Sequence, residues 1–95
     1  VDANEALSIG LVDRVVAPDA GYDEALAFAK QRAAGPGVAL RAAKNAINRG
    51  LDVDLATGLE IERMQFAQLF ATEDQKNGMD SFVENGPGKA TFEGR

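Results

Sequence analysis

The chain ends in the segment NGPGKATFEGR, which places a lysine inside a run of glycine and proline residues. Lysine beside glycine is the chemistry of phosphate-binding loops, where backbone N–H groups and an ammonium group surround the phosphates. That motif has the form G-x-x-x-x-G-K-[ST] and sits between a strand and a helix. Here its first glycine position holds Val83, and Ala90 follows Lys89 where a hydroxyl is needed. The tail therefore does not form a phosphate-binding loop by itself.

Carboxylates are the next candidates, for metal binding or acid–base catalysis. Asp52 and Asp54 flank a valine, but oxygen-liganding metals need about six donors, and capping of a following helix explains these aspartates better. Glu60 and Arg63 have the i,i+3 spacing of a solvated helix face. Glu73 and Asp74 fall in the first turn of a predicted helix, where negative charge interacts favourably with the helix dipole. None has a histidine, cysteine or lysine partner at motif spacing, so we expect no catalytic residue and no metal site.

Aromatic and basic side chains could instead bind a ligand or a partner. Phe66, Phe70 and Phe82 recur at helical spacing, which is more typical of packing in a core or an interface than of a ligand box. A small basic stripe consists of Arg41, Lys44 and Arg49. It is too sparse for nucleic acid on an acidic protein, although a small phosphate-bearing ligand could meet it.

The composition bounds the possible functions. The chain has 95 residues, of which 45% are hydrophobic and 26% charged, with a net charge of −5. This length allows one domain at most, and the negative charge disfavours nucleic acids and anionic membranes. Cysteine and histidine are absent, so there is no disulfide, thiolate nucleophile or imidazole base. No apolar run reaches the length of a membrane span. We expect an intracellular, cytoplasmic protein without a resident cofactor.

The elements that must position these residues are mainly helices. The helical spacing of apolar residues, interrupted by glycine and proline, predicts five helices. The first three cover residues 3–9, 22–34 and 38–49. The fourth is capped by residue 52 or 54 and extends to about residue 71, and the fifth starts at residue 73 and ends at the glycine at 86. The valine-rich segment 11–17 predicts one short extended stretch. The predicted fold class is therefore mainly all-α. The chain is expected to form a single segment, residues 1–95.

Local signals set the expected helix ends. Asp2 with Glu5, and Thr72 with Gln75, have the form of capping boxes. Gly10 suits a left-handed position after the first helix, Pro36 suits a first helical position, and Gly50 with Leu51 suggests a Schellman ending. The fourth helix carries a wide apolar stripe formed by Leu55, Leu59, Phe66, Leu69 and Phe70. Such faces exceed what a short chain can bury and predict contact with further protein.

Four stretches, in order, resemble the C-terminal part of the crotonase family, the enoyl-CoA hydratase/isomerase superfamily. They are DANEALSIGLVDRVV, GPGVALRAAKNAIN, FAQLFATEDQKNGMDSFVEN and KATFEGR. The resemblance covers nearly the whole chain and implies the C-terminal helical region of a crotonase-like fold. It also implies that the chain, which begins without methionine, is a piece of a longer protein.

The resemblance implies a function in acyl-CoA chemistry. In the family, an oxyanion hole of backbone N–H groups stabilises an enolate, and glutamates position the water that adds across a 2-enoyl thioester. These parts are expected upstream, and no glutamate of this chain matches a catalytic one. The glutamates in question are Glu5, Glu24, Glu60, Glu62, Glu73, Glu84 and Glu93. The piece is therefore expected to be inactive alone and to serve oligomerisation and closure of the CoA pocket in a hydratase of fatty-acid metabolism.

Site residues follow from the same resemblance. Phe82 matches a family phenylalanine that contacts CoA, whereas the family's lysine three residues later is Asn85 here. Lys89, beyond an inserted Gly-Pro-Gly, is expected to reach the same phosphates. Phe66, Leu69 and Phe70 are expected at a subunit or domain junction of a homotrimer or hexamer. The usual Glu-Gly of the last helix is Asn-Gly here, and isomerase or other family reactions remain open.

Two other hypotheses do not need the family. The chain could be a free-standing helical module that binds a partner helix along the stripe from Leu55 to Phe70. A small metal-dependent enzyme is a third, but the sequence does not provide its ligands.

Overall fold

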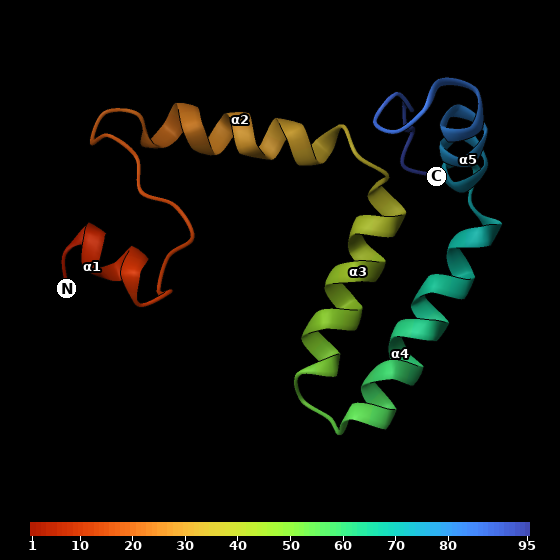
Figure 1. Ribbon diagram of the computed structural model, residues 1–95, viewed down its shortest axis with the longest axis horizontal. Coiled ribbons are helices and arrows are strands. Elements are labelled where there is room, and N and C mark those ends of the chain that lie inside the picture. The colour runs from red at the N-terminus through yellow and green to blue at the C-terminus, as the bar shows by residue number, and fades with distance from the viewer. The chain divides into compact units, whose positions relative to one another are not determined.

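The computed structural model describes residues 1–95 and is built of helices (Figure 1). In chain order they are α1 (Ala3–Ser8), α2 (Gly21–Ala33), α3 (Gly37–Gly50), α4 (Leu55–Gln68), the 3₁₀ turn η1 (Leu69–Ala71) and α5 (Glu73–Asn85). No strand is present. The expected mainly all-α fold is thus confirmed. None of the helices has both the length and the apolar character that crossing a membrane requires.

The chain divides into two compact units, Val1–Gln31 and Arg32–Arg95. The expectation of a single segment covering the whole chain stays a prediction.

In the first unit, local hydrogen bonds define α1. Asp2 accepts a hydrogen bond from the backbone N–H of Glu5 at 2.8 Å, as the capping pattern predicts. At the other end Gly10 has a φ of +73°. The N–H groups of Gly10 and Leu11 donate to the carbonyls of Leu7 and Ala6 at 3.2 and 2.9 Å. This is a Schellman ending, which needs a residue that tolerates a left-handed backbone.

Residues 11–17 lie between α1 and α2 outside any helix. Although valine-rich, they form no strand, because no second strand lies beside them to complete a ladder. Arg14 in this segment faces α2, with its guanidinium 3.5 Å from the Glu24 carboxylate and 5.9 Å from the centre of the Phe28 ring. These exposed contacts link the segment to α2.

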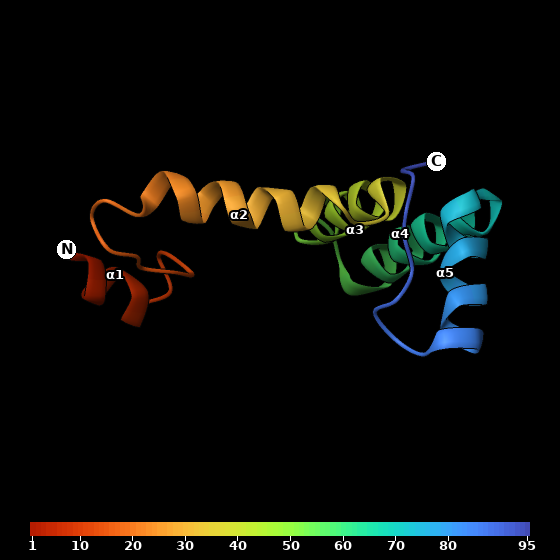
Figure 2. The same ribbon diagram turned by 90° about the horizontal axis from the view of Figure 1, so that it is seen from above.

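The second unit begins with an antiparallel pair of helices, α3 and α4, which run side by side in both views (Figures 1 and 2). They approach closely at two glycines. A Cβ built on Gly58 would lie 3.6 Å from both the Cα and the carbonyl oxygen of Gly50. Small residues at such a crossing let two backbones come together without displacing side chains.

The predicted Schellman ending at Gly50 is wrong. Gly50 is the last residue of α3 and has no positive φ, and Leu51 after it is still right-handed, with its N–H bonded to the carbonyl of Ile47 at 3.2 Å. Gly50 serves the approach of α4 instead of a reversal of the backbone. Pro36 likewise stands one position before the first helical residue, as the N-cap of α3.

The ends of α4 and α5 follow the sequence signals. Asp54, not Asp52, is the N-cap of α4, and its carboxylate accepts from the N–H of Thr57 at 3.1 Å. Thr72 caps α5 by accepting from the N–H of Gln75 at 3.2 Å. Gly86, with a φ of +79°, ends α5. The expected single helix to about residue 71 is α4 continued by η1.

Few apolar side chains are buried. The buried hydrophobic residues are Ala6, Ala42 and Ile61. By contrast Leu55 is 78% exposed and Phe66 61% exposed, although both belong to the apolar stripe of α4. The expectation that the helices carry more apolar surface than the chain buries therefore agrees with the structure.

Candidate ligand site at the C-terminal tail

Residues 86–95 form a tail that turns back along α5 (Figure 2). Gly86 reverses the chain after α5, and Gly88 and Gly94 also have positive φ values, of +74° and +78°. Between the tail and α5 lies a cavity of about 240 Å³. The residues that line it are Gly78, Phe82, Gly86, Gly88, Ala90 and Phe92. We refer to it as the tail cavity.

Of the two residues expected to bind CoA, Phe82 lines this cavity and Lys89 lies in the tail segment beside it. Phe82 lines the tail cavity and is 57% exposed. Lys89 is exposed and lies between Gly88 and Ala90, which both line the cavity. The structure thus brings Phe82 and the segment carrying Lys89 together. Asn85, at the family's lysine position, is the exposed last residue of α5.

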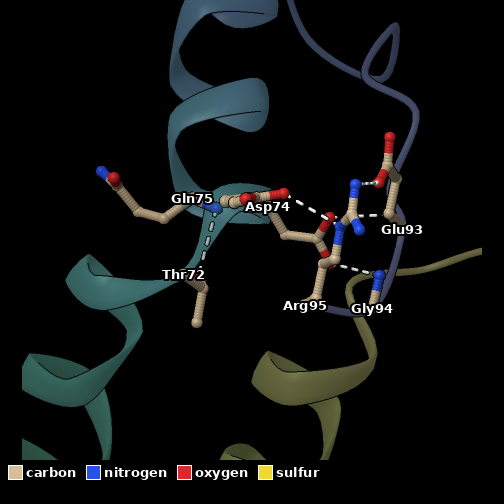
Figure 3. Close-up of polar contacts among 7 residues, drawn as sticks. Thr72, Asp74, Gln75, Glu93, Gly94 and Arg95 are labelled. Atoms are coloured by element: carbon tan, nitrogen blue, oxygen red, sulfur yellow. Dashed lines mark hydrogen bonds and ion pairs between the residues drawn. The ribbon is translucent and has the colours of Figure 1, made fainter.

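One buried carboxylate fixes the tail to α5. Asp74 is only 3% exposed, and its two oxygens accept hydrogen bonds from the backbone N–H groups of Glu93 and Gly94 at 2.7 and 2.8 Å. Its own N–H donates to the carbonyl of Arg95 at 3.0 Å. Figure 3 shows this contact between the first turn of α5 and the end of the tail. We call these three hydrogen bonds the Asp74 clasp.

Close packing accompanies the clasp. A Cβ on Gly78 would lie 3.4 Å from the edge of the Phe92 ring, so the glycine leaves room for that ring against α5. A Cβ on Gly37 would lie 3.6 Å from the Cα of Gly94. The tail is therefore held against α5 and also lies beside the first residue of α3.

Ion pairs around the clasp are at the surface. Arg95 pairs with Glu73, with 2.9 Å between its Nε and the carboxylate, and also with Glu93. All three side chains are more than half exposed, and such pairs contribute little to stability. The buried Asp74 is the stronger fixing point, because hydrogen bonds to a charged group out of water are strong.

The role of Asp74 was not predicted from the sequence. Its position in the first turn of a helix suggested a solvated charge that suits the helix dipole. The partners of Asp74 are 19 and 20 residues away along the chain, so no local spacing could reveal them. The one sequence feature that could have pointed to this contact is the glycine at position 94. Its left-handed backbone helps to present two successive N–H groups to one carboxylate.

A second hollow lies between α3 and α4. This apolar groove, of about 560 Å³, is lined mainly by alanine, leucine and glycine residues of both helices, together with Phe66 and Leu69. Phe66 also contacts Phe70 edge to face, with ring centres 5.3 Å apart. Phe70 is 56% exposed, and Leu69 is half-buried. The three residues expected at an interface are thus gathered at the end of α4 and in η1.

Two carboxylates of the second unit accept hydrogen bonds from backbone N–H groups. Both oxygens of Asp74 already accept hydrogen bonds, so this carboxylate is not placed to take a proton from a ligand. The carboxyl group of Asp54 has a shifted pKa. Hydrogen bonds from the Thr57 hydroxyl and N–H lower its pKa below the ordinary value of 3.8. These hydrogen bonds cap the N-terminus of α4. No group of three carboxylates gathers as a metal site.

Comparison with known proteins then decides the family. The family model for enoyl-CoA hydratase/isomerase matches residues 1–95, the whole length of the chain. The chain belongs to the enoyl-CoA hydratase/isomerase family. The resemblance of the four sequence stretches is therefore confirmed.

Individual members of the enoyl-CoA hydratase/isomerase family are similar over most of this chain. A probable enoyl-CoA hydratase of Rhizobium meliloti is 53% identical over 87% of this chain and 32% of its own length. A short-chain-enoyl-CoA hydratase of Clostridium acetobutylicum is 42% identical over 88% of this chain and 32% of its own length.

A solved structure supports the same assignment to the enoyl-CoA hydratase/isomerase family. A crystal structure described as an enoyl-CoA hydratase subunit I from Geobacillus kaustophilus matches with a TM-score of 0.93 and 40% identity. The match covers 100% of this chain and 36% of the Geobacillus kaustophilus chain. The chain thus spans about one third of the length of the relatives it matches.

Proposed function

We propose that this chain forms the CoA-closing and subunit-contacting part of a cytoplasmic enoyl-CoA hydratase that acts on a 2-enoyl-CoA in fatty-acid metabolism. The observation that carries the proposal is the match of the enoyl-CoA hydratase/isomerase family model over residues 1–95. The names of the similar proteins favour a hydratase over the other reactions of the family.

The proposed reaction adds water across the double bond next to the thioester. The hydroxyl bonds to the β-carbon and the proton to the α-carbon, so no oxidant and no resident cofactor is consumed. The groups that stabilise the enolate and position the water are proposed to lie in the part of the relatives that this chain does not span. This chain would supply binding energy to the non-reacting CoA portion, which raises catalytic efficiency when it orients the thioester.

Two features support this division of labour. Phe82 and the segment carrying Lys89 meet at the tail cavity, where an aromatic ring and an ammonium group could hold the nucleotide end of CoA. The α3–α4 groove and the exposed rings of Phe66 and Phe70 offer an apolar surface for subunit contacts in a homotrimer or hexamer.

The test is turnover by the full-length gene product. Incubation with crotonyl-CoA should remove the absorbance of the conjugated thioester and form the 3-hydroxyacyl-CoA, identified by mass spectrometry. The isolated 95-residue chain should give no turnover and should bind CoA more weakly than millimolar. Hydration by the isolated chain would contradict the division of labour, and failure of the full-length product with every 2-enoyl-CoA tested would contradict the hydratase assignment.

A further inference from the structure

We infer that Asp74 is a positioning residue, which holds the tail loop so that Lys89 faces the phosphates of a bound acyl-CoA. The tail loop is residues 86–92, between the end of α5 and the Asp74 clasp. The inference rests on the proposed function, because it concerns how the same CoA site is arranged. Asp74 would act on the CoA site through the tail and would not itself touch the ligand.

The burial of Asp74 is the first step. It is the one buried charged side chain of the protein, at 3% exposure. A carboxylate is costly to remove from water unless its oxygens are hydrogen-bonded. Both oxygens are satisfied here, and the donors are backbone N–H groups of the tail rather than of α5 itself. The carboxylate is therefore committed to holding the tail.

The tail has little else to define its path. Residues 87–95 contain no helix and no strand, so they lack a ladder of backbone hydrogen bonds. Their buried anchors are the Asp74 clasp and the Phe92 ring beside Gly78, and the ion pair of Arg95 with Glu73 adds an exposed one. Without the clasp, residues 93–95 would lose their buried hydrogen bonds and keep the exposed ion pair of Arg95 with Glu73, so the tail would sample many more backbone conformations.

The tail loop is thus fixed at both ends. At its start, the N–H of Gly86 donates to the carbonyl of Phe82 at 3.0 Å, and at its end the clasp holds Glu93 and Gly94. Lys89 lies between these anchors. A loop with fixed ends presents its lysine at lower entropic cost on binding, which is the general benefit of preorganisation.

The charges of the tail single out Lys89. The other basic residue of the tail, Arg95, is paired with Glu73 and Glu93. Lys89 forms no ion pair in the structure, and its neighbours in the chain, Gly88 and Ala90, line the tail cavity. Its ammonium group is available to a phosphate, and the position of its backbone depends on the Asp74 clasp.

The experiment compares two substrates in the full-length gene product. Crotonyl-CoA carries the phosphates and the adenosine, whereas S-crotonyl-pantetheine has the same reacting thioester without either. Asp74→Asn replaces one accepting oxygen with an amide donor, which opposes a backbone N–H. For crotonyl-CoA it should lower kcat/KM by roughly threefold or more through KM, as expected for loss of one exposed charge contact. For S-crotonyl-pantetheine, kcat/KM should not change.

A double-mutant cycle tests the link to the lysine. Lys89→Ala should cause a similar loss for crotonyl-CoA, and the double variant should lose no more than either single variant, because both changes remove one contact. Asp80→Asn is the matched control. It makes the same substitution at an exposed position of α5 and should leave both substrates unaffected.

Other outcomes overturn the inference. Equal losses on both substrates would show a merely structural role, and additive losses would show that Asp74 does not act through Lys89. If Asp74→Asn does not fold, deletion of residues 92–95 keeps Lys89 but removes the clasp, and it should produce the same selective loss. A deletion variant with an undiminished preference for crotonyl-CoA would refute the positioning role. Wild-type protein that hydrates neither substrate would refute the proposed function itself, and this inference with it.

Discussion

Asp54 and Asp74 are both near the start of a helix, and each holds backbone N–H groups, but over different distances. Asp54 is exposed and accepts hydrogen bonds from the N–H and hydroxyl of Thr57, three residues away. Asp74 is buried and accepts from residues 19 and 20 positions away. The first arrangement follows from sequence spacing alone. The second could not be predicted, because the sequence does not show that the tail returns to α5.

The lowered pKa of Asp54 gives a pH-dependent prediction for α4. Its hydrogen bonds from Thr57 favour the ionised form in the helix, so its stabilising contribution is fully present above the unfolded pKa near 3.8 and is lost as the pH falls through the lower folded value. A peptide of residues 50–71 should therefore lose helical circular dichroism as the pH falls below about 3.8, the ordinary pKa of the carboxyl group. In an Asp54→Asn peptide, which keeps an accepting oxygen, this part of the loss should be absent.

The acid titration of Asp54 can be separated from that of other carboxylates. Glu60 and Glu62 are present in both peptides, so the difference between the two pH curves reports Asp54. Asp52→Asn is the control, because Asp52 is not the N-cap and its substitution should preserve the acid transition. Coincident curves for wild type and Asp54→Asn would contradict the prediction.

At the scale of elements, the helices were predictable to within a few residues because their ends are set by local chemistry. Asp2, Thr72 and Gly86 act as expected from their neighbours in the sequence. The wrong interpretation concerned Gly50. A glycine at a helix end usually permits a left-handed backbone, but here it permits the approach of α4. Only the pairing of two helices distinguishes these uses, and that pairing is tertiary.

The crossing of α3 and α4 should tolerate one methyl group but not a larger side chain. In Gly58→Ala the new Cβ would lie 3.6 Å from Gly50, an ordinary contact. Since alanine favours a helix over glycine, the unfolding free energy should stay the same or rise by up to about 1 kcal/mol. Gly58→Leu should force the helices apart and cost about 1–3 kcal/mol.

Thermal unfolding of the full-length gene product measures the effect at the crossing. The Tm of Gly58→Leu should fall clearly below those of wild type and Gly58→Ala. Gly21→Leu serves as the control, because a Cβ at Gly21 would have no atom within 4 Å. If Gly58→Leu melts like wild type, the two glycines do not govern the packing of α3 on α4.

At the scale of the whole molecule, the main finding is how little of the apolar surface is covered. The buried hydrophobic residues include two alanines and one isoleucine, whereas aromatic and aliphatic side chains of α4 and α5 are more than half exposed, among them Phe66, Met79 and Phe82. The sequence predicted this excess from its amphipathic patterns. It could not predict which faces pair within the chain, because α3, α4 and α5 all carry an apolar side.

The exposed apolar surface predicts how the isolated 95-residue chain behaves. Burial of apolar area is the dominant favourable term in folding, and here much of that area stays in water. We expect a loosely protected chain that self-associates, with amides of the first unit exchanging within seconds and a sedimentation coefficient that rises with concentration. A free-standing interaction module would instead be a rigid monomer with slowly exchanging amides.

The substitution Phe66→Asp should reduce the self-association, because Phe66 is 61% exposed at the α3–α4 groove. The control Gln68→Asp, at an exposed position of the same helix, should leave the self-association unchanged. A protected monomer at every concentration would mean that the chain is complete as a fold, and its apolar faces would then need another explanation than contact with further protein.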